Sequence, residues 1–298
     1  MKWICLWLAL ATSAAAAQPL PEVDVGRIER LPALQSRHVD SRPVDIWLPA
    51  DYSPAKRYRV LYMHDGQMLF DASKSWNQQA WNVHVAVNRL VQQGRIPDTL
   101  VVGVWNNGAL RRSEYYPAPL LPFVKEPGRQ QFVDQELQGR VRSDGYLRYL
   151  VEELKPAVNA RYATLRGREH TFIMGSSMGG LISIHAMNEY PHVFGGAAGL
   201  STHWVGSREA DSHLPLAAFS HLRDKLADPA THRLYMDHGT TGLDALYAPH
   251  QTFINQIVKD RGYSAANSLS PVFEGAGHNE RAWAARLEIP LLFLLGLR

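Results

Sequence analysis

The chain has 298 residues, enough for one large α/β domain or two small domains with a sizeable core. Its 31 Lys and Arg against 28 Asp and Glu leave a formal charge of +3, and the basic residues are scattered, which argues against a nucleic-acid-binding protein. Charged residues make up 20% of the sequence, and it has no low-complexity tract and no repeat of fixed period, so a disordered chain or a solenoid is excluded.

The first 17 residues, MKWICLWLALATSAAAA, have the order of a secretory signal peptide: a basic residue, an apolar run, then small residues. We expect cleavage before Gln18 and an exported protein, periplasmic or extracellular; a buried N-terminal helix is the alternative. The segment is too short for a membrane anchor, so we expect no stable membrane insertion after cleavage. It contains Cys5, the one cysteine of the sequence, so the mature chain would have no disulfide, no cysteine metal site and no cysteine nucleophile.

The mature chain begins with strand and helix signals in alternation. Apolar runs predict strands at 44–49 (VDIWLP) and 59–66 (RVLYMHDG), the second of which leads into a turn. Residues 81–94 have apolar side chains on one helical face, and Gly94 can end that helix. Residues 99–105 (TLVVGVW) are almost continuously apolar, as in a parallel strand that is covered on both faces.

A long segment without periodicity comes next. Residues 106–141 are rich in Pro, Gly and Arg, and we expect a long irregular insertion there. Helical spacing returns at 145–162, where Pro156 is expected to bend the end of the helix.

The rest of the chain alternates regularly between the two patterns. It predicts strands at 170–175, 193–201, 231–239 and 268–277, and helices at 178–189, 249–262 and 279–289. The apolar stretch IPLLFLLGL at 289–297 is too short to span a bilayer, so we expect it to pack as a final helix or tail. With no linker in the mature chain, this alternation predicts a single α/β domain, residues 18–298, with a largely parallel sheet.

The sequence GSSMG at 175–179 matches the pattern G-x-S-x-G centred on Ser177, between a predicted strand and a predicted helix. In a nucleophile elbow the serine occupies a strained, tight turn, and glycines beside it let the strand and the helix approach each other. Ser176 is not the centre, because Met174 stands where the pattern needs glycine. A glycine-rich phosphate-binding turn is the alternative, but G-x-G-x-x-G is absent and the motif comes late in the chain. We therefore predict Ser177 as a nucleophile.

A serine nucleophile needs a base to accept its proton and a third group to orient that base. In α/β-hydrolases the order along the chain is Ser, then Asp or Glu, then His. His278 lies between the last predicted strand and the last predicted helix, in a glycine-containing loop. The other histidines after Ser177 lie within or beside earlier elements, so His278 is the predicted base; a surface loop histidine is the alternative.

The acid is expected in the loop after the strand at 231–239. Asp244 fits that loop, and its alternative role is a carboxylate near the N-terminus of the following helix. Asp237 is the second candidate, although it lies within the strand, where its side chain would point into the packing of the sheet.

Charge that develops on a substrate carbonyl oxygen needs preorganised donors. We expect one from the backbone N–H of Met178, at the start of the helix after the elbow, and a second from Gln67 or its neighbour in HDGQMLF. His64 and Asp65 provide two ligand types and not a coordination sphere, so we expect neither a metal nor another cofactor.

At this point the residues resemble the family called "Putative esterase", a group of α/β-hydrolases that includes S-formylglutathione hydrolases (esterase D), enterochelin-type esterases, feruloyl and acetyl-xylan esterase modules, and mycolyltransferases. The resemblance covers most of the mature chain and depends on LYMHDGQMLFD, VVGVWNN with RRSEYYP, EELKPAVNARY, GSSMGG, DHGTTGLDALY and GHNERAW, in that order. It implies an α/β-hydrolase fold with a mostly parallel sheet and helices on both faces, a secreted bacterial-type esterase, the triad Ser177, Asp244 and His278, and an oxyanion hole near Gln67 and Met178.

Further side chains are candidates for substrate binding. Arg112, with Arg111 and Glu114, could clamp an acidic or hydroxyl-rich substrate, or it could hold its own loop in place. Trp105 and Trp204, with Tyr115, could line an acyl or aromatic pocket, although core packing explains buried aromatic residues equally well.

Three functions are compatible with these residues. The first is hydrolysis of a carboxylic ester of a small acid, sugar or siderophore through an acyl-enzyme on Ser177. The second is acyl transfer from the same intermediate to an alcohol. The third is a noncatalytic binding protein on the same fold, against which the ordered Ser, Asp and His argue. The expected partner is a small-molecule ester.

Overall fold

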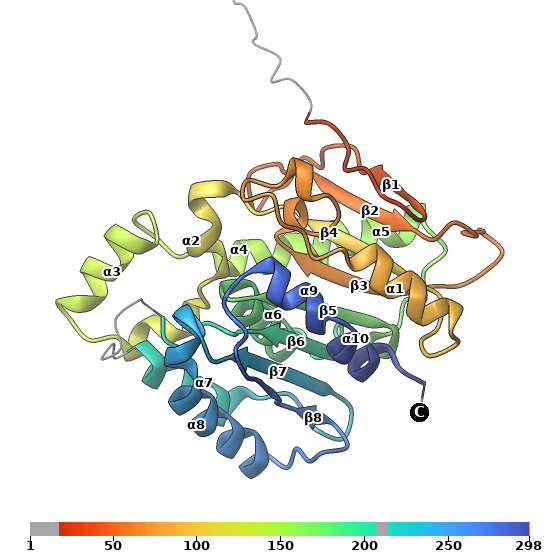
Figure 1. Ribbon diagram of the computed structural model, residues 1–298. Helices are drawn as coiled ribbons and strands as arrows, with labels where there is room; N and C mark the ends of the chain where they lie inside the picture. The colour runs from red at the N-terminus through yellow and green to blue at the C-terminus, as the bar shows by residue number, and fades with distance from the viewer. Residues whose placement is uncertain (1–17, 207–213, 298) are drawn as a thin grey trace, which may run out of the picture.

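The computed structural model describes residues 18–206 and 214–297; the predicted signal peptide at 1–17 lies outside these residues. Within these ranges one sheet of nine strands crosses the molecule (Figure 1), in the order β1-β2-β4-β3-β5-β6-β7-β8, with β9 also paired to β7. The strands are β1 Arg27–Arg30, β2 Val44–Leu48, β3 Arg59–His64, β4 Thr99–Val104, β5 Thr171–Ser176, β6 Gly196–Leu200, β7 Arg233–Gly239, β8 Ser268–Leu269 and β9 Val272–Phe273.

The sheet is parallel from β4 to β9 and antiparallel only at one edge. β4, β3, β5, β6 and β7 pair in parallel, as do β7 with β8 and with β9. β1 pairs with β2, and β2 with β4, in antiparallel register. The sequence analysis missed β1, because its residues RIER are charged and only partly buried and show no apolar alternation. The mostly parallel sheet that the apolar runs predicted is present.

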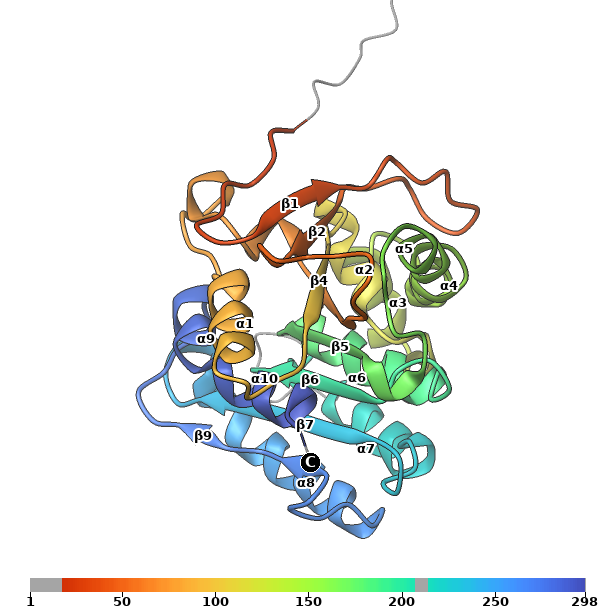
Figure 2. The same cartoon turned by 90° about the vertical axis from the view of Figure 1, so that its right-hand side faces the viewer.

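Helices cover both faces of the sheet (Figure 2). On one face, α1, α9 and α10 pack with the core that contains Leu61, Met174 and Tyr235; on the other, α4, α5, α6, α7 and α8 pack with a larger core. The helices are α1 Val83–Gln92, α2 Arg111–Tyr115, α3 Gly128–Glu136, α4 Ser143–Arg148, α5 Lys155–Arg161, α6 Met178–Glu189, α7 Leu214–Lys225, α8 Tyr247–Asp260, α9 Glu280–Arg286 and α10 Glu288–Leu295. Across residues 18–206 and 214–297, none of the helices combines the length and the apolar character that crossing a membrane requires.

Most of the predicted elements are present, with two local differences. The helix expected at 145–162 is α4 and α5 joined by a π-helical turn at Tyr149–Leu154. The last expected strand is divided into β8 and β9, because Pro271 between them cannot donate a ladder hydrogen bond. The C-terminal apolar stretch forms a final helix, α10, as expected, and it contacts β6 and β7. Helix α7 was not predicted from the sequence.

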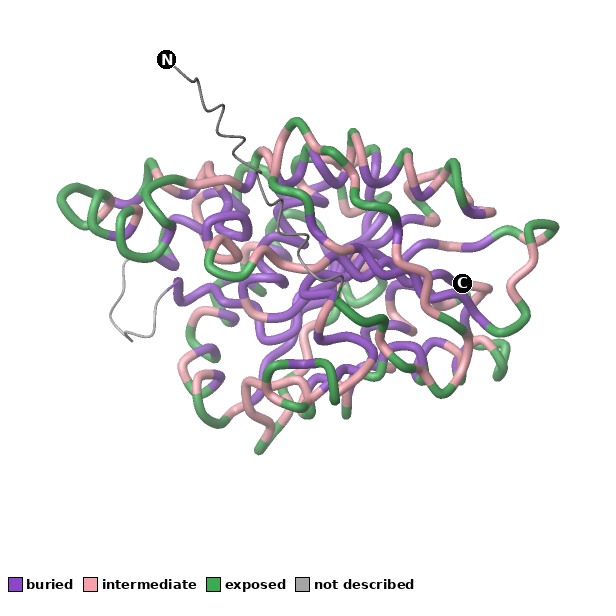
Figure 3. Tube along the Cα trace, turned by 90° about the horizontal axis from the view of Figure 1, so that it is seen from above, coloured by how far each residue is buried: buried purple, intermediate pink, exposed green. Residues whose placement is uncertain are grey.

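The expected irregular insertion at 106–141 is helical, so that expectation was wrong. It contains α2, α3 and the short 3₁₀ segments Gly108–Leu110 and Ala118–Phe123. The sequence shows no helical periodicity there because each helix has fewer than three turns. α2 is largely buried, whereas α3 is mostly exposed at one end of the molecule (Figure 3).

Candidate active site

Ser177 lies at the turn between β5 and α6 with φ 56° and ψ −124°. A positive φ is strained for a residue with a side chain, so the surroundings must hold it. Its N–H donates to the carbonyl of Leu200 at 2.9 Å, and its carbonyl accepts from the N–H of Gly180 at 3.1 Å. A Cβ at Gly175 would stand 2.7 Å from the backbone carbonyl of Gly179. The absence of a side chain at 175 therefore lets β5 and α6 approach closely enough to form this turn.

His278 is held against Asp244, in the loop that precedes α9. Nδ1 of His278 and Oδ1 of Asp244 are 2.6 Å apart, and because a carboxylate can only accept, Nδ1 is the donor. The imidazole also packs edge-on against Tyr247 at 5.8 Å and Trp283 at 5.1 Å between ring centroids. These contacts set the ring orientation and leave Nε2 as the nitrogen that can accept a proton.

Asp244 is fully buried in the short helix Gly242–Leu246 after β7. Its Oδ2 accepts from the hydroxyl of Ser201 at 2.6 Å and from the backbone N–H of Gly239 at 2.7 Å. Burial by itself would raise the pKa of Asp244, but the hydrogen bonds from His278 and Ser201 outweigh it, so the pKa lies below its ordinary value. Asp244 is therefore a carboxylate at neutral pH and can stabilise a charged imidazolium on His278.

Asp237, the second candidate for the acid, has a different partner. Its carboxylate accepts from Arg286 at 2.8 and 3.1 Å and from the hydroxyl of Tyr235 at 2.8 Å, deep in the sheet. Burial raises the pKa of Asp237, and the Arg286 guanidinium opposes that rise. Of the two aspartates, Asp244 is the one that contacts His278.

Ser177 and His278 open into the same cavity of about 680 Å³ at the carboxyl ends of the parallel strands. The volume lies in the range of small-molecule sites. The wall combines aromatic and charged side chains, among them Trp76, Trp81, Trp283, Asp65, Arg111, Arg112 and Glu280. The cavity can therefore contact both a ring system and polar groups of a ligand.

Of the two expected oxyanion donors, Met178 lines the cavity and Gln67 lies behind its wall. Met178 is the first residue of α6 and lines the cavity, and an N–H at that helix position has no acceptor within the helix. Gln67 is in the 3₁₀ helix Gly66–Met68 after β3; its side-chain oxygen accepts from the N–H of Asn106 at 3.2 Å. Met68 and Asn106 line the cavity, whereas the Gln67 side chain supports the wall.

The arginines of α2 line the cavity but are paired with acidic groups. Arg111 donates to both carboxylate oxygens of Asp65 at 2.6 and 2.8 Å. Arg112 is 3.1 Å from the Glu136 carboxylate. Glu114 turns away and forms a fully buried pair with Arg42 at 2.6 and 2.7 Å. These contacts agree with the alternative that the arginines hold their own loop in place through charged pairs.

The structure places the two predicted tryptophans outside the cavity, so their assignment as its lining was wrong. Trp105 donates from Nε1 to Asp45 at 2.8 Å and lies under the guanidinium of Arg30. Trp204 is buried and donates to Gln251 at 2.9 Å. Both tryptophan side chains contact other residues of the protein and not the cavity. A sequence pattern does not distinguish a tryptophan that packs in this way from one that lines a ligand site.

Sequence reasoning missed Ser201, Tyr247 and His203. The Tyr247 hydroxyl is 2.8 Å from Nδ1 of His203 and within hydrogen-bonding reach of the Ser177 side chain. Ser201 accepts from Trp283 at 2.9 Å while it donates to Asp244. Ser201 directly follows an apolar strand, a position at the carboxyl edge of the sheet that could have identified it.

The chain matches a known protein family over most of its length. Residues 37–294 match the family described as "Putative esterase". The uncharacterized protein YbbA of Bacillus subtilis (strain 168) is 22% identical over 89% of this chain and 96% of its own length.

Two solved structures have the same fold. The ferulic acid esterase AmCE1/Fae1A from Anaeromyces mucronatus, in complex with ferulic acid, has a TM-score of 0.63 at 17% identity and covers 94% of each chain. The enterobactin esterase FES from Shigella flexneri, in the presence of 2,3-di-hydroxy-N-benzoyl-glycine, has a TM-score of 0.66 at 15% identity over 92% of this chain and 60% of its own. The α/β-hydrolase fold, and the match over most of the described residues, show that the chain belongs to the "Putative esterase" family, and it is accordingly an ester hydrolase.

Proposed function

We propose that the chain is a serine carboxylic-ester hydrolase, with Ser177 as nucleophile, His278 as general base and Asp244 as the group that orients the base. The 2.6 Å contact between Asp244 and His278, in the cavity that also exposes Ser177 on its strained turn, carries this proposal. Nothing in the proposal requires a bound metal or cofactor.

The geometry suggests the order of proton transfers. Because Nδ1 of His278 donates to Asp244, Nε2 can accept the Ser177 proton as the hydroxyl oxygen attacks the ester carbonyl. The N–H of Met178 and a second N–H at the segment of Gln67 would stabilise the resulting oxyanion. Imidazolium then protonates the leaving alcohol, and water, activated by the same imidazole, releases the acid from Ser177. The Tyr247 hydroxyl would hold the Ser177 side chain in the resting enzyme.

We further propose that the substrate is an ester of a small acid, with a sugar or a siderophore as the larger alternatives. The tryptophans Trp76, Trp81 and Trp283 offer a surface for an aromatic ring, and the Arg111–Asp65 ion pair in the cavity wall offers polar contacts for hydroxyl groups. The Anaeromyces structure is a complex with ferulic acid, and the Shigella structure was determined in the presence of 2,3-di-hydroxy-N-benzoyl-glycine. Aromatic acyl esters are therefore the first class to assay.

The nucleophile is tested by reaction with a fluorophosphonate and location of the adduct by mass spectrometry, together with hydrolysis of p-nitrophenyl acetate. We expect the adduct on Ser177 and the loss of at least about 10³-fold in kcat in Ser177→Ala. Ser176→Ala is the matched control, because its serine adjoins the nucleophile and lines the same cavity. An adduct on another residue, or full activity in Ser177→Ala, would overturn the assignment. An added alcohol acceptor would reveal acyl transfer as an ester product in place of the free acid.

We also propose that the enzyme is exported, through a signal peptide at residues 1–17. The order of basic, apolar and small residues in this segment supports the proposal. N-terminal sequencing of protein recovered from the periplasm or medium should begin at Gln18. An intact N-terminus on protein that stays with the cytoplasm would contradict export.

A further inference from the structure

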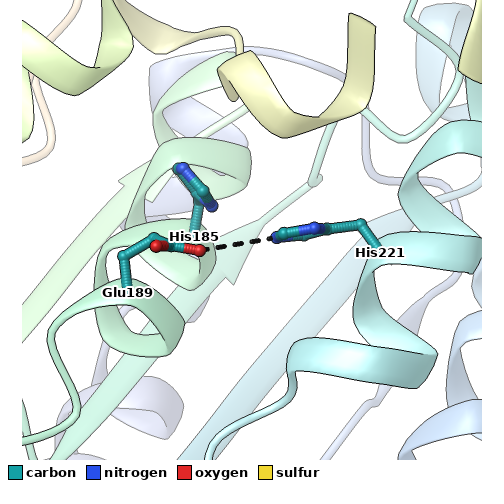
Figure 4. Close-up of side chains that lie close together, drawn as sticks. All are labelled: His185, Glu189 and His221. Atoms are coloured by element: carbon teal, nitrogen blue, oxygen red, sulfur yellow. Dashed lines mark ion pairs between the residues drawn. The ribbon is translucent and has the colours of Figure 1, made fainter. Parts of the chain in front are cut away.

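A cluster of three metal-ligating side chains lies away from the active-site cavity. His185 and Glu189 are on α6, and His221 is on α7. One ligand atom from each lies within 4.8 Å of the other two, and Figure 4 shows the three side chains gathered between the two helices. The spacing of four residues puts His185 and Glu189 on the same face of α6.

Both histidines have a buried ring nitrogen without a partner. Among the described residues, no hydrogen bond reaches Nδ1 of His185 or Nε2 of His221. A buried polar atom that has lost its water and gained no partner destabilises the folded state. Nε2 of His221 faces the Glu189 carboxylate at 3.9 Å, too far for a hydrogen bond. A cation placed among the three side chains would give Nε2 of His221 and the Glu189 carboxylate a shared partner.

The surroundings of the cluster favour metal binding. Both imidazole rings are buried, and a buried imidazole nitrogen without a hydrogen-bond partner is available as a metal ligand. Glu189 is half exposed, so its carboxylate can move toward an ion at low cost. α6 ends at Glu189, and the free carbonyl groups of a helix C-terminus add a favourable field for a cation.

A small cavity adjoins the cluster. It has a volume of about 10 Å³ and is lined by both histidines and by Asn188, with apolar residues around them. A space of that size holds about one water molecule or one ion. The surface of this space is almost entirely apolar and Glu189 does not line it, so it adjoins the three ligands and is not itself the ion site.

We propose that His185, Glu189 and His221 bind one divalent transition-metal ion of the zinc class, which joins α6 to α7. Two imidazole nitrogens and one carboxylate oxygen are a known ligand set for zinc, with solvent as the fourth ligand. Tetrahedral bonds of about 2.0–2.2 Å place ligand atoms about 3.3–3.6 Å apart. From separations within 4.8 Å, the side chains must therefore close by up to about 1.5 Å. The N-terminal end of α6 adjoins Ser177, and the ion would fix the position of its C-terminal end.

The sequence did not reveal this cluster, because His221 is far along the chain from His185 and no short spacing motif links them. The proposal is independent of the proposed reaction, since it concerns no residue of the active site. Its test is therefore a binding experiment and not an activity assay.

The experiment uses the mature protein after treatment with EDTA and removal of the chelator. Zinc chloride is titrated calorimetrically, and cobalt(II) is added separately to record the visible absorption of a tetrahedral site. We expect one ion per chain, and a rise in Tm of about 5 °C or more at a free zinc concentration 100 times Kd. Magnesium, which prefers six oxygen ligands, should not bind there.

Glu189→Gln and His221→Gln should each weaken zinc binding at least tenfold and remove the cobalt absorption. Glu189→Gln changes an exposed group by one atom, so it should fold even if the buried His221→Gln does not. His192→Gln, an exposed histidine close to the end of α6, is the control and should bind as the wild type does. The proposal would be overturned if the wild type showed no saturable zinc binding, which is the result expected if the site holds only water. It would also be overturned if Glu189→Gln bound zinc as tightly as the wild type.

Discussion

Gly175→Ala tests whether the close approach of β5 and α6 sets the position of Ser177. The added Cβ would lie 2.7 Å from the carbonyl carbon and oxygen of Gly179 and 3.0 Å from its Cα. These are backbone atoms, so no side chain can rotate out of the way. Gly175 is therefore a position where a single methyl group must move the strand or the helix.

The size of the shift follows from the contact distances. Ordinary contacts begin near 3.4 Å, so the difference from 2.7 Å requires a displacement of about 0.7 Å between β5 and α6. Overpacking of this kind costs about 1–3 kcal/mol in the free energy of unfolding, which corresponds to a fall in Tm of about 3–10 °C. A misplacement approaching 1 Å at a nucleophile lowers kcat/KM by about 10- to 100-fold.

The assay combines calorimetric Tm with kcat/KM on p-nitrophenyl acetate. Gly128→Ala is the matched control, because Gly128 begins the exposed helix α3 and a Cβ there meets nothing within 4 Å. Alanine favours the helix, so Tm should stay the same or rise slightly in this variant, with no change in kcat/KM. If Gly175→Ala behaves like Gly128→Ala in both measurements, the close approach does not position Ser177 and the argument fails.

Other substitutions separate the two aspartates. Asp244→Asn should lower kcat by about 10³- to 10⁴-fold, because an amide cannot stabilise the charged imidazole of His278; a loss below tenfold would argue that Asp244 is not the acid. Asp237→Asn leaves Arg286 buried without its carboxylate, and should lower stability by about 3–5 kcal/mol with kcat of the folded enzyme changed little; the reverse pattern would make Asp237 the acid. Burial alone would raise the pKa of Asp244, but the hydrogen bonds from His278 and Ser201 lower it. The stability of the fold should therefore depend on this carboxylate at acid pH. The carboxylate stabilises the fold above about pH 4 and that contribution is lost as the pH falls through the lowered pKa. The difference in Tm between wild type and Asp244→Asn should therefore shrink below about pH 4, and a constant difference would contradict this.

Short-range patterns in the sequence were enough to predict most of the elements and a candidate nucleophile. The apolar runs and helical periodicity predicted most strands and helices, and α6 begins and ends at the predicted residues 178 and 189. G-x-S-x-G, read between a strand and a helix, identified Ser177 because the glycine requirement is local: it depends on contacts within one turn. The charged strand β1 and the short helices of residues 106–141 escaped because they have too few residues to show a period.

Only the tertiary structure decided which partners meet across the sheet edge. The order of residues left Asp237 and Asp244 both open, and the fold brings Asp244 to His278 and Asp237 to Arg286. It also turned Trp204 away from the cavity, and placed His221 beside His185 on the next helix. Contacts between residues far apart in the chain depend on how whole helices and strands pack, and local sequence patterns do not predict this packing. The sequence determines which chemical groups are available, and the packing determines which of them are in contact.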